Sequence, residues 1–288
     1  GDGTTDTLKN FVTEGTSILP GWEPSGSFSD LQSWINTVHK LTFRYSQSGL
    51  NPDGTISHHV GHRADLAGYG YGFDWLFEHF HFGKGLQHTP WAMDSSVFSI
   101  SAEFTNDFYS SVLYKNGLDY QAAGRSFFSH NVGNFSSEEL ISNGITPLLA
   151  AGSSTKFKGS GALNQLRFDL NTNLHKVDNN LNAAYNRAYW VNDFLIQRSD
   201  DANPYYMSVK MQSDRTRGAE SFGSDPGYHN GNGVLQVKTA GDEYDLSRYS
   251  WDWHTLSGTT SALRDDVLPT QSSLEAFNEN HFSGVLSN

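Results

Sequence analysis

Apolar residues in the first half of the chain recur with the spacing of α-helices. Between residues 31 and 45 they fall at i, i+3, i+4, i+7, i+10 and i+14, which predicts a helix that ends before a Gly and Pro break. Two further apolar stretches, residues 73–80 and 97–112, predict a second and a third helix. A weaker helix is expected to begin near residue 136, where acidic residues suit the first turn. Successive helices of this kind predict antiparallel hairpins in a bundle or toroid.

The pattern changes to that of β-strands in the second half of the chain. Residues 194–198, 205–211 and 234–239 have strand-like composition or alternation, and clusters of Gly, Asn, Asp and Ser separate them. We therefore expect an antiparallel sheet. The two patterns give two domains, a helical portion over residues 1–155 and a β portion over residues 156–288.

Composition narrows the class of protein. The chain has 288 residues, 36% of them hydrophobic and 14% aromatic, which is enough for two domains with a sizeable core. It contains no apolar run near the roughly 20 residues of a membrane helix, so no membrane partner is expected. The absence of cysteine excludes disulfides, thiolate metal sites and a cysteine nucleophile. The net charge of -12 argues against nucleic acid as the partner.

An anionic substrate is compatible with this charge only where basic residues cluster. The densest such cluster contains His58, His59, His62 and Arg63. His58 and His62 have the i, i+4 spacing of helical zinc ligands, but no Glu lies between them and a Pro-Asp-Gly turn signal precedes them. We therefore favour a substrate-facing loop over a histidine-ligated metal hydrolase, and we expect no metal site and no required cofactor.

The residues around this cluster carry a family resemblance. D-G-T at residues 53–55, with a histidine six residues after the aspartate, resembles the D-G-[ST] turn and catalytic histidine of polysaccharide lyase family 8, the chondroitin and hyaluronan lyases. The resemblance implies that His59 is catalytic. It also implies a catalytic tyrosine, for which Tyr69 and Tyr71 compete, and the family's spacing to a G-R pair favours Tyr71. That pair resembles the A-A-G-R run ending at Arg125, the implied site arginine.

Two blocks in the second half extend the resemblance. Residues 209–220 resemble the family's V-K-M-x-S-x-R-T-x-x-x-E strand and loop, which makes Glu220 the fourth implied catalytic residue. Residues 251–260 resemble the W-D-W-N-x-x-P-G-T-T run, with His254 and Ser257 in place of Asn and Pro. The shared order and spacing of the blocks make the resemblance specific.

Two features depart from the family pattern. The family has an Asn in a G-A-N-x-x-D motif, whereas the corresponding residues 1–6 offer Gly3, so another group must neutralise the substrate carboxylate. Residues 282–288 resemble the family's F-x-G-G-V-S-D-G strand, which lies before a complete β-sandwich would close. We therefore expect the chain to be part of a longer protein.

The resemblance implies an α+β multidomain fold, an incomplete (α/α) toroid followed by an antiparallel β-sandwich portion. It implies a lyase that cleaves uronic-acid-containing glycosaminoglycan (chondroitin or dermatan sulfate, or hyaluronan) by β-elimination. The expected partner is an anionic polysaccharide, the expected location is secreted or periplasmic, and the expected state is a monomer or an association with the rest of its own chain. The alternative is a non-catalytic carbohydrate-binding protein derived from such a lyase. Residues expected to bind substrate beside the catalytic set are His58, His62, Arg63, Tyr69, Trp75 and Trp91.

Overall fold

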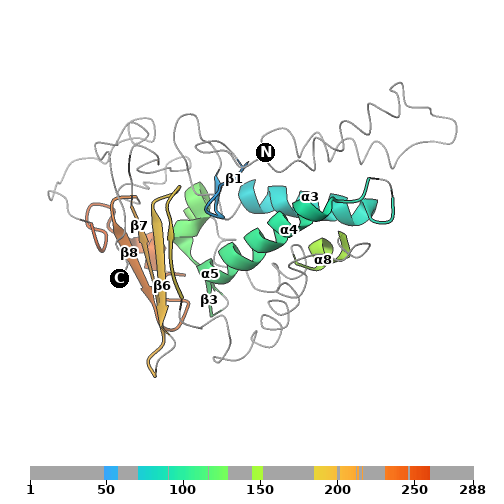
Figure 1. The fold of residues 1–288 in the computed structure, drawn as a ribbon. Helices are drawn as coiled ribbons and strands as arrows, with labels where there is room; N and C mark the ends of the chain where they lie inside the picture. The colour runs from blue at the N-terminus through green and yellow to red at the C-terminus, as the bar shows by residue number, and fades with distance from the viewer. Residues whose placement is uncertain are drawn as a thin grey trace.

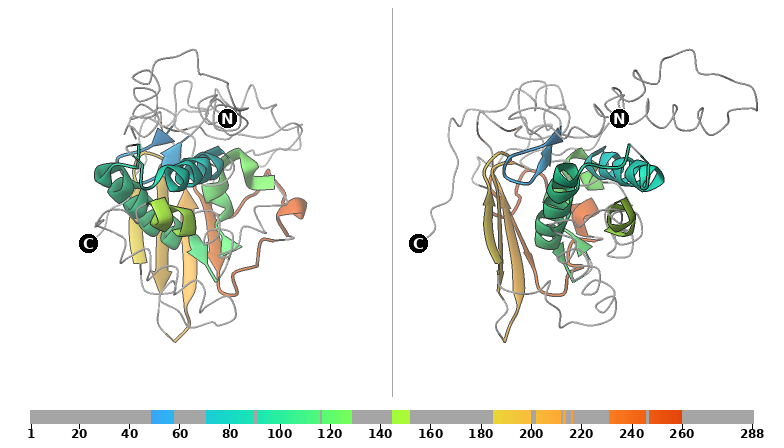
Figure 2. Two further views of the ribbon diagram at one scale, coloured as in Figure 1. Left: turned by 90° about the vertical axis from the view of Figure 1, so that its right-hand side faces the viewer. Right: turned by 45° about the vertical axis from the view of Figure 1, so that its right-hand side comes forward.

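A layer of helices packs on one face of a four-stranded antiparallel sheet (Figures 1 and 2). Within the described residues, no helix is both long and apolar enough to cross a membrane. The structure is a computed structural model that describes residues 49–57, 71–89, 91–115, 117–128, 145–151, 185–199, 202–211, 213, 216, 231–245 and 247–259.

Both helices predicted within this part of the first half are confirmed. The first is α3 (Tyr71–Leu86), which buries Phe73 and Phe80. The second includes a π-helical segment, in which the turn is wider than in an α-helix. It runs without a break through α4 (Ser95–Phe104), η1 (Thr105–Tyr109) and α5 (Ser110–Val112).

Shorter helical segments complete this part of the fold. The 3-10 segment η2 (Tyr120–Phe128) follows the second helix, and α8 (Thr146–Ala151) packs against α3 and α4. A third segment, η5 (Ser247–Ser250), lies beyond the sheet in the sequence. The helices predicted over residues 31–45 and from residue 136 lie outside the described residues.

The antiparallel sheet predicted for the second half is confirmed. Its strands follow the order β5-β6-β7-β8, and every neighbouring pair is antiparallel. The last three strands match the predicted segments to within one residue at each end, whereas β5, with the sequence YNRAY, was not predicted. The strands are β5 (Tyr185–Tyr189), β6 (Phe194–Ser199), β7 (Tyr205–Lys210) and β8 (Val234–Lys238).

The first half also contains two short β-hairpins that the helical pattern did not predict. One pairs β1 (Gly49–Leu50) with β2 (Ile56–Ser57), and the other pairs β3 (Leu113–Tyr114) with β4 (Gly117–Leu118). The turn signal at residues 52–54 is confirmed as the loop of the first hairpin, because Gly54 has φ 86° and donates its N–H to the Asn51 carbonyl at 3.0 Å. Glycine suits this left-handed conformation because it has no Cβ.

An aromatic cluster joins the helical layer to the sheet. Phe108 of η1 stacks on Phe104 with ring centroids 5.4 Å apart, and its edge contacts Tyr189 of β5 at 5.8 Å. The hydroxyl groups of Tyr189 and Ser111 lie 2.6 Å apart, so the phenol has a hydrogen-bond partner inside the core. Burial of these rings contributes to the attraction between the two layers.

The inner face of the sheet also carries buried cationic side chains. Arg198, Tyr206 and Lys238 lie side by side on β6, β7 and β8 and are each at most 6% exposed. Lys238 donates to the Leu118 carbonyl at 2.9 Å, and Arg198 donates to the Leu113 carbonyl at 3.3 Å. Such partners offset the cost of burying charge, which would otherwise disfavour this packing.

Tyr206 contributes a buried hydrogen bond to the same row. Burial, followed by the nearby charge of Asp119, raises the pKa of Tyr206 well above its usual value. The phenol therefore stays neutral and donates to Asp119 at 2.6 Å.

The chain after β8 folds back over the edge of that strand. The backbone N–H of Leu235 donates to the Ser257 carbonyl at 2.9 Å, and that of Val237 donates to the Tyr244 hydroxyl at 2.8 Å. Gly258, with φ 85°, allows this approach, because a Cβ at its position would lie 2.4 Å from the Gly233 carbonyl oxygen. The strand edge is thus protected from pairing with another chain.

Replacing Gly258 with alanine should therefore destabilise the protein. We expect Gly258→Ala to lower the free energy of unfolding by about 2–3 kcal/mol, from the left-handed backbone and the displaced contact. The matched control is Gly85→Ala in α3, where a Cβ meets nothing within 4 Å and should stabilise the helix by about 0.5–1 kcal/mol. Urea unfolding measures both, and equal effects of the two substitutions would contradict the packing at Gly258.

Candidate active site

The D-G-T turn is fastened to the sheet by its own aspartate. Asp53, 7% exposed, accepts hydrogen bonds from the Thr55 N–H and hydroxyl with one carboxylate oxygen, at 3.1 and 2.7 Å. Its other oxygen accepts the backbone N–H of Val191 at 2.8 Å, in the turn that joins β5 to β6. The aspartate of the motif is therefore structural, and it fixes the hairpin that leads towards His59.

A buried amide adds a second connection between the same segments. Asn192, fully buried in the β5–β6 turn, donates to the Thr55 hydroxyl at 2.6 Å and accepts from the Ser57 hydroxyl at 3.3 Å. Asn51 donates to both hydroxyls from the other side, at 2.9 and 2.7 Å. Each hydroxyl is thereby held between partners whose donor and acceptor roles agree, which fixes the hairpin in one register.

The second motif block is attached to the same turn. Asp193, with φ 48°, accepts the hydroxyl groups of Ser213 and Thr216 at 2.5 and 3.0 Å. Its carbonyl accepts the Met211 N–H at 2.8 Å, and Lys210 donates to the neighbouring Asn192 carbonyl at 2.7 Å. The V-K-M-x-S-x-R-T residues therefore hold the chain that continues to Glu220.

The two motif blocks thus meet at one buried cluster, which we call the polar hub. Its members come from the first hairpin, from the β5–β6 turn and from the chain after β7, and each is at most 7% exposed. Both blocks resemble catalytic motifs in the sequence, and both contribute polar side chains to fold contacts. The members are Asn51, Asp53, Thr55, Ser57, Asn192, Asp193, Ser213 and Thr216.

Two of the predicted catalytic residues are placed by their backbones. Tyr71 is the first residue of α3, and Arg125 follows the kink at Gly124 in η2, where the backbone leaves helical geometry at φ 61° and ψ -140°. Figures 1 and 2 place η2 and the start of α3 at the end of the sheet that also carries the β1–β2 hairpin. The backbone therefore brings these two positions to the end of the molecule that holds the polar hub.

Seven further predicted site residues have no described side chain. The backbone of Trp75 lies in α3, near Tyr71, while its side chain is outside the described part. The six others of this group lie outside the described residues: His58, His59, His62, Arg63, Tyr69 and Glu220.

Trp91 is the one predicted binding residue whose side chain is described, and it lies away from the start of α3. Its backbone N–H donates to the Thr89 hydroxyl at 3.2 Å, in the turn that follows the helix. Because α3 has 16 residues, it is about 24 Å long and separates Trp91 from Tyr71. The structure therefore does not bring these two residues together.

The W-D-W-H block forms a turn despite its departures from the family pattern. Asp252 accepts the backbone N–H of His254 at 3.0 Å and the Thr255 hydroxyl at 2.9 Å. The His254 N–H, followed by the Thr255 hydroxyl, lowers the pKa of the Asp252 carboxyl. Ser257 contributes its backbone carbonyl to Leu235, so this contact does not depend on the side chain at that position.

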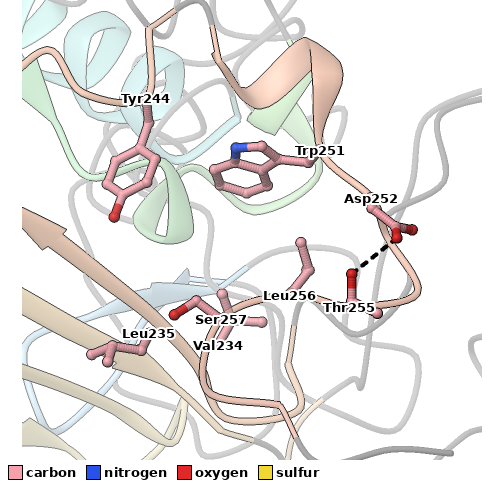
Figure 3. Close-up of a pocket in the computed structure, with 8 residues that line it drawn as sticks. All are labelled: Val234, Leu235, Tyr244, Trp251, Asp252, Thr255, Leu256 and Ser257. Carbon is pink, nitrogen blue, oxygen red and sulfur yellow. Dashed lines mark hydrogen bonds between the residues drawn. The ribbon is translucent and has the colours of Figure 1, made fainter. Parts of the chain in front are cut away.

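This block frames a small pocket at the edge of β8. The pocket has a volume of about 170 Å³ (Figure 3). Tyr244 and Trp251 lie on one side of it, opposite Leu256 and Ser257. Its lining residues are Val234, Leu235, Tyr244, Trp251, Asp252, Thr255, Leu256 and Ser257.

Metal-binding clusters can be assessed only in the described part of the chain. Over the part of the chain that the structure describes, no group of three or more His, Asp or Glu side chains could hold a metal ion. Enzymes of polysaccharide lyase family 8 need no cofactor.

Comparison with known proteins identifies the second half of the chain. Residues 184–288 match the family model described as polysaccharide lyase family 8, super-sandwich domain. No curated protein sequence matches the chain.

Solved structures extend the likeness to most of the chain. A chondroitinase AC lyase, studied in enzyme–oligosaccharide complexes, is similar over 89% of this chain and 36% of its own, with 19% identity and a TM-score of 0.70. A Paenibacillus xanthan lyase is similar over 84% and 25%, with 18% identity and a TM-score of 0.63. A Streptomyces coelicolor A3 chondroitin AC lyase in complex with chondroitin sulphate is similar over 86% and 37%, with 15% identity and a TM-score of 0.64.

The solved structures show the class of fold, and the family model shows which family residues 184–288 resemble. At such identities the solved structures show the fold alone, which is the fold of a helical layer and sheet found in polysaccharide lyases. The family model thus confirms, over residues 184–288, the resemblance to polysaccharide lyase family 8 that was inferred from the motifs. The chain spans between a quarter and somewhat over a third of the length of these solved lyases.

The sequence motifs did not reveal Asn192, Asp193 or Arg187. An Asn-Asp pair between two strand-like runs is a hairpin signal, so the turn itself could have been predicted. Its buried contacts could not, because they depend on residues more than 130 positions earlier in the chain.

Loss of the Asn192 amide should weaken the whole protein. We expect Asn192→Ala to lower the free energy of unfolding by about 2–4 kcal/mol, because it removes two buried hydrogen bonds and leaves polar partners unsatisfied. The control is Asn186→Ala on the exposed side of β5, with an expected change within about 0.5 kcal/mol. Urea unfolding at one pH compares the two, and an equally small effect of Asn192→Ala would contradict the role of the polar hub.

Proposed function

We propose that the protein is a polysaccharide lyase that cleaves uronic-acid-containing glycosaminoglycan by β-elimination and releases unsaturated oligosaccharides. The substrates that we propose are chondroitin or dermatan sulfate and hyaluronan. The described helices would then form part of an incomplete (α/α) toroid, and the sheet would form part of a β-sandwich. Because one similar structure is a xanthan lyase, xanthan is included as a test substrate.

The observation that carries the proposal is the attachment of both motif blocks to the polar hub. His59 follows Ser57 by two residues, so it lies within about 7 Å of it along the chain. Glu220 follows Thr216 by four residues, which allows at most about 14 Å. Ser57 and Thr216 bind adjacent residues of one turn, so the chain geometry permits His59 and Glu220 to meet.

The chemistry requires three tasks that the predicted residues can divide. Elimination removes the proton at C5, α to the uronic carboxylate, and expels the 4-linked sugar, so the carboxylate must be neutralised while a base and an acid act. Arg125 offers a fixed charge and a planar fork that suit the carboxylate. Tyr71 would take the proton as phenolate and return one to the leaving oxygen, and neutral His59 would act from the other face. Glu220 is the fourth residue of the proposed catalytic site.

The place of Tyr71 in the fold supports its role. As the first residue of the 16-residue helix α3, it lies at the positive end of the helix dipole, which stabilises negative charge. The kink at Gly124 turns the chain immediately before Arg125, at the same end of the molecule. Both features support the proposal that Tyr71 acts as a phenolate and Arg125 as a fixed cation.

The partner and location follow from the same proposal. The net charge of -12 means that the protein as a whole repels a polyanion, so binding needs a local basic patch, for which Arg63, Arg125 and the histidines near His59 are the candidates. Members of the family are extracellular or secreted, and we propose a secreted or periplasmic location for this protein. We propose that it acts as a monomer or with the rest of its own chain.

A second function is favoured by one specific departure. Gly3 stands where the family motif has the Asn that neutralises the substrate carboxylate. A protein without that group could bind the polysaccharide and not cleave it. Binding of glycosaminoglycan without appearance of product would support this alternative, whereas chelator sensitivity and addition of water to the product would indicate a metal hydrolase.

The direct test removes the phenol of Tyr71. Tyr71→Phe should lower turnover by about 10² to 10⁴-fold on a panel of chondroitin, dermatan, hyaluronan and xanthan, because a general acid/base group is lost while the ring remains. The near-ultraviolet absorbance of the unsaturated product measures the rate. Tyr205→Phe, at the opposite end of the sheet in β7, is the matched control and should keep full activity. Near-native turnover of Tyr71→Phe on every cleaved substrate would refute the assignment.

A further inference from the structure

We propose that Arg187 is a positioning residue for His59, and that Asp107 of the π-helical segment η1 holds Arg187 in that role. The inference rests on the proposed function of His59. Neither residue belongs to the motifs that carry the family resemblance. Together they form a second support for the β1–β2 hairpin, beside that of Asn192.

Arg187 bridges the helical layer and the D-G-T turn. One terminal nitrogen donates to the Asp107 carboxylate at 3.1 Å, and the other donates to the Asp53 carbonyl at 3.0 Å. The guanidinium also lies over the Tyr189 ring, 4.9 Å from its centroid. Because the guanidinium is planar and rigid, its contacts with Asp107 and Tyr189 also fix the direction in which it donates to the Asp53 carbonyl.

The contact with the turn is close as well as polar. A Cβ at Gly54 would lie 3.3 Å from the terminal nitrogen of Arg187, so the guanidinium packs against the loop at van der Waals distance. Displacing the guanidinium would therefore remove this contact from the turn. The hairpin ends two residues before His59, so a small movement of the turn is passed on to that residue.

The π-helical segment explains how Asp107 reaches Arg187. Phe104, Phe108 and Tyr109 are buried around it, whereas the side chain of Asp107 is 47% exposed. A π turn contains more residues than an α turn, so it admits one additional residue without removing its neighbours from the core. Segments of this kind occur often at functional sites, and here the polar residue faces β5.

The bridge is suited to positioning more than to stability. The Arg187 and Asp107 side chains are 32% and 47% exposed, and ion pairs with such exposure contribute little to folding. The polar hub holds the hairpin independently through Asp53 and Asn192. Removing the bridge should therefore shift the hairpin without unfolding it, and a displacement of about 1 Å can reduce catalysis by about 10²-fold.

The kinetic test uses Arg187→Met, Arg187→Lys and Asp107→Asn. Arg187→Met should reduce kcat by about 10-fold or more with little change in KM, because substrate contacts remain and geometry is lost. Arg187→Lys should recover only part of the rate, since an ammonium group cannot bridge both partners in a fixed plane. Combining Arg187→Met with Asp107→Asn should cause no further loss, because both act through one bridge.

Matched controls separate the bridge from a general effect of charge. Lys84→Met and Asp242→Asn remove exposed charges in α3 and after β8, and each should leave kcat unchanged. Unchanged kcat in Arg187→Met, or equal losses in Lys84→Met, would overturn the proposal. An increase in KM alone would also overturn the proposal, because it would mean that Arg187 binds substrate.

Hydrogen exchange tests the positioning apart from the proposed activity. In Arg187→Met the amides of Gly54 and Thr55 should exchange at least about 10-fold faster, while those of β6 and β7 keep their protection. If the unaltered protein released no unsaturated product, the proposed function would fail, and this measurement would still decide the bridge. Unchanged exchange in the hairpin would overturn the positioning role.

Discussion

The structure depends on a buried set of hydrogen bonds at the turn between β5 and β6. Asn192 and Asp193 of this turn bind polar side chains from segments more than 130 residues before them and about 20 residues after them. Each partner is removed from water, so an unmade bond would cost the full desolvation of the group. This cost makes the arrangement specific, because an alternative register of the hairpin would leave several buried groups unsatisfied.

The same constraint explains why two motifs that resemble catalytic blocks contain so many structural residues. Asp53, Ser213 and Thr216 make buried contacts in the fold. In the sequence, the chain continues from them to His59 on one side and to Glu220 on the other. Under the proposed function, such structural residues would preserve the geometry that places the reactive groups.

Much of the fold could be predicted from local patterns, and the elements that could not be predicted escaped for physical reasons. The apolar spacing in α3 and in α4 to α5 is strong because those helices bury aromatic residues on one face. Strand β5 was not predicted because a polar residue interrupts the apolar alternation typical of a strand. Arg187 and Tyr189 project to the inner face and alternate with exposed Asn186 and Ala188. The β1–β2 hairpin escaped prediction because two-residue strands are stabilised by distant partners such as Asn192, which no local window contains.

For the site, the motifs supplied the candidates, whereas Arg187 and Asp107 depend on a contact between two layers that only the folded chain reveals.

The most direct test of the central claim is the distance between positions 59 and 220, measured by electron paramagnetic resonance between two spin labels. The chain has no cysteine, so His59→Cys with Glu220→Cys provides the two labelling sites without other changes. The account predicts one narrow distribution below about 30 Å, given the short chain lengths from the polar hub. It also predicts that Asn192→Ala broadens this distribution and that Asn186→Ala leaves it unchanged. A broad or longer distribution in the parent chain, or one insensitive to Asn192→Ala, would contradict the claim that the polar hub brings the two motif blocks together.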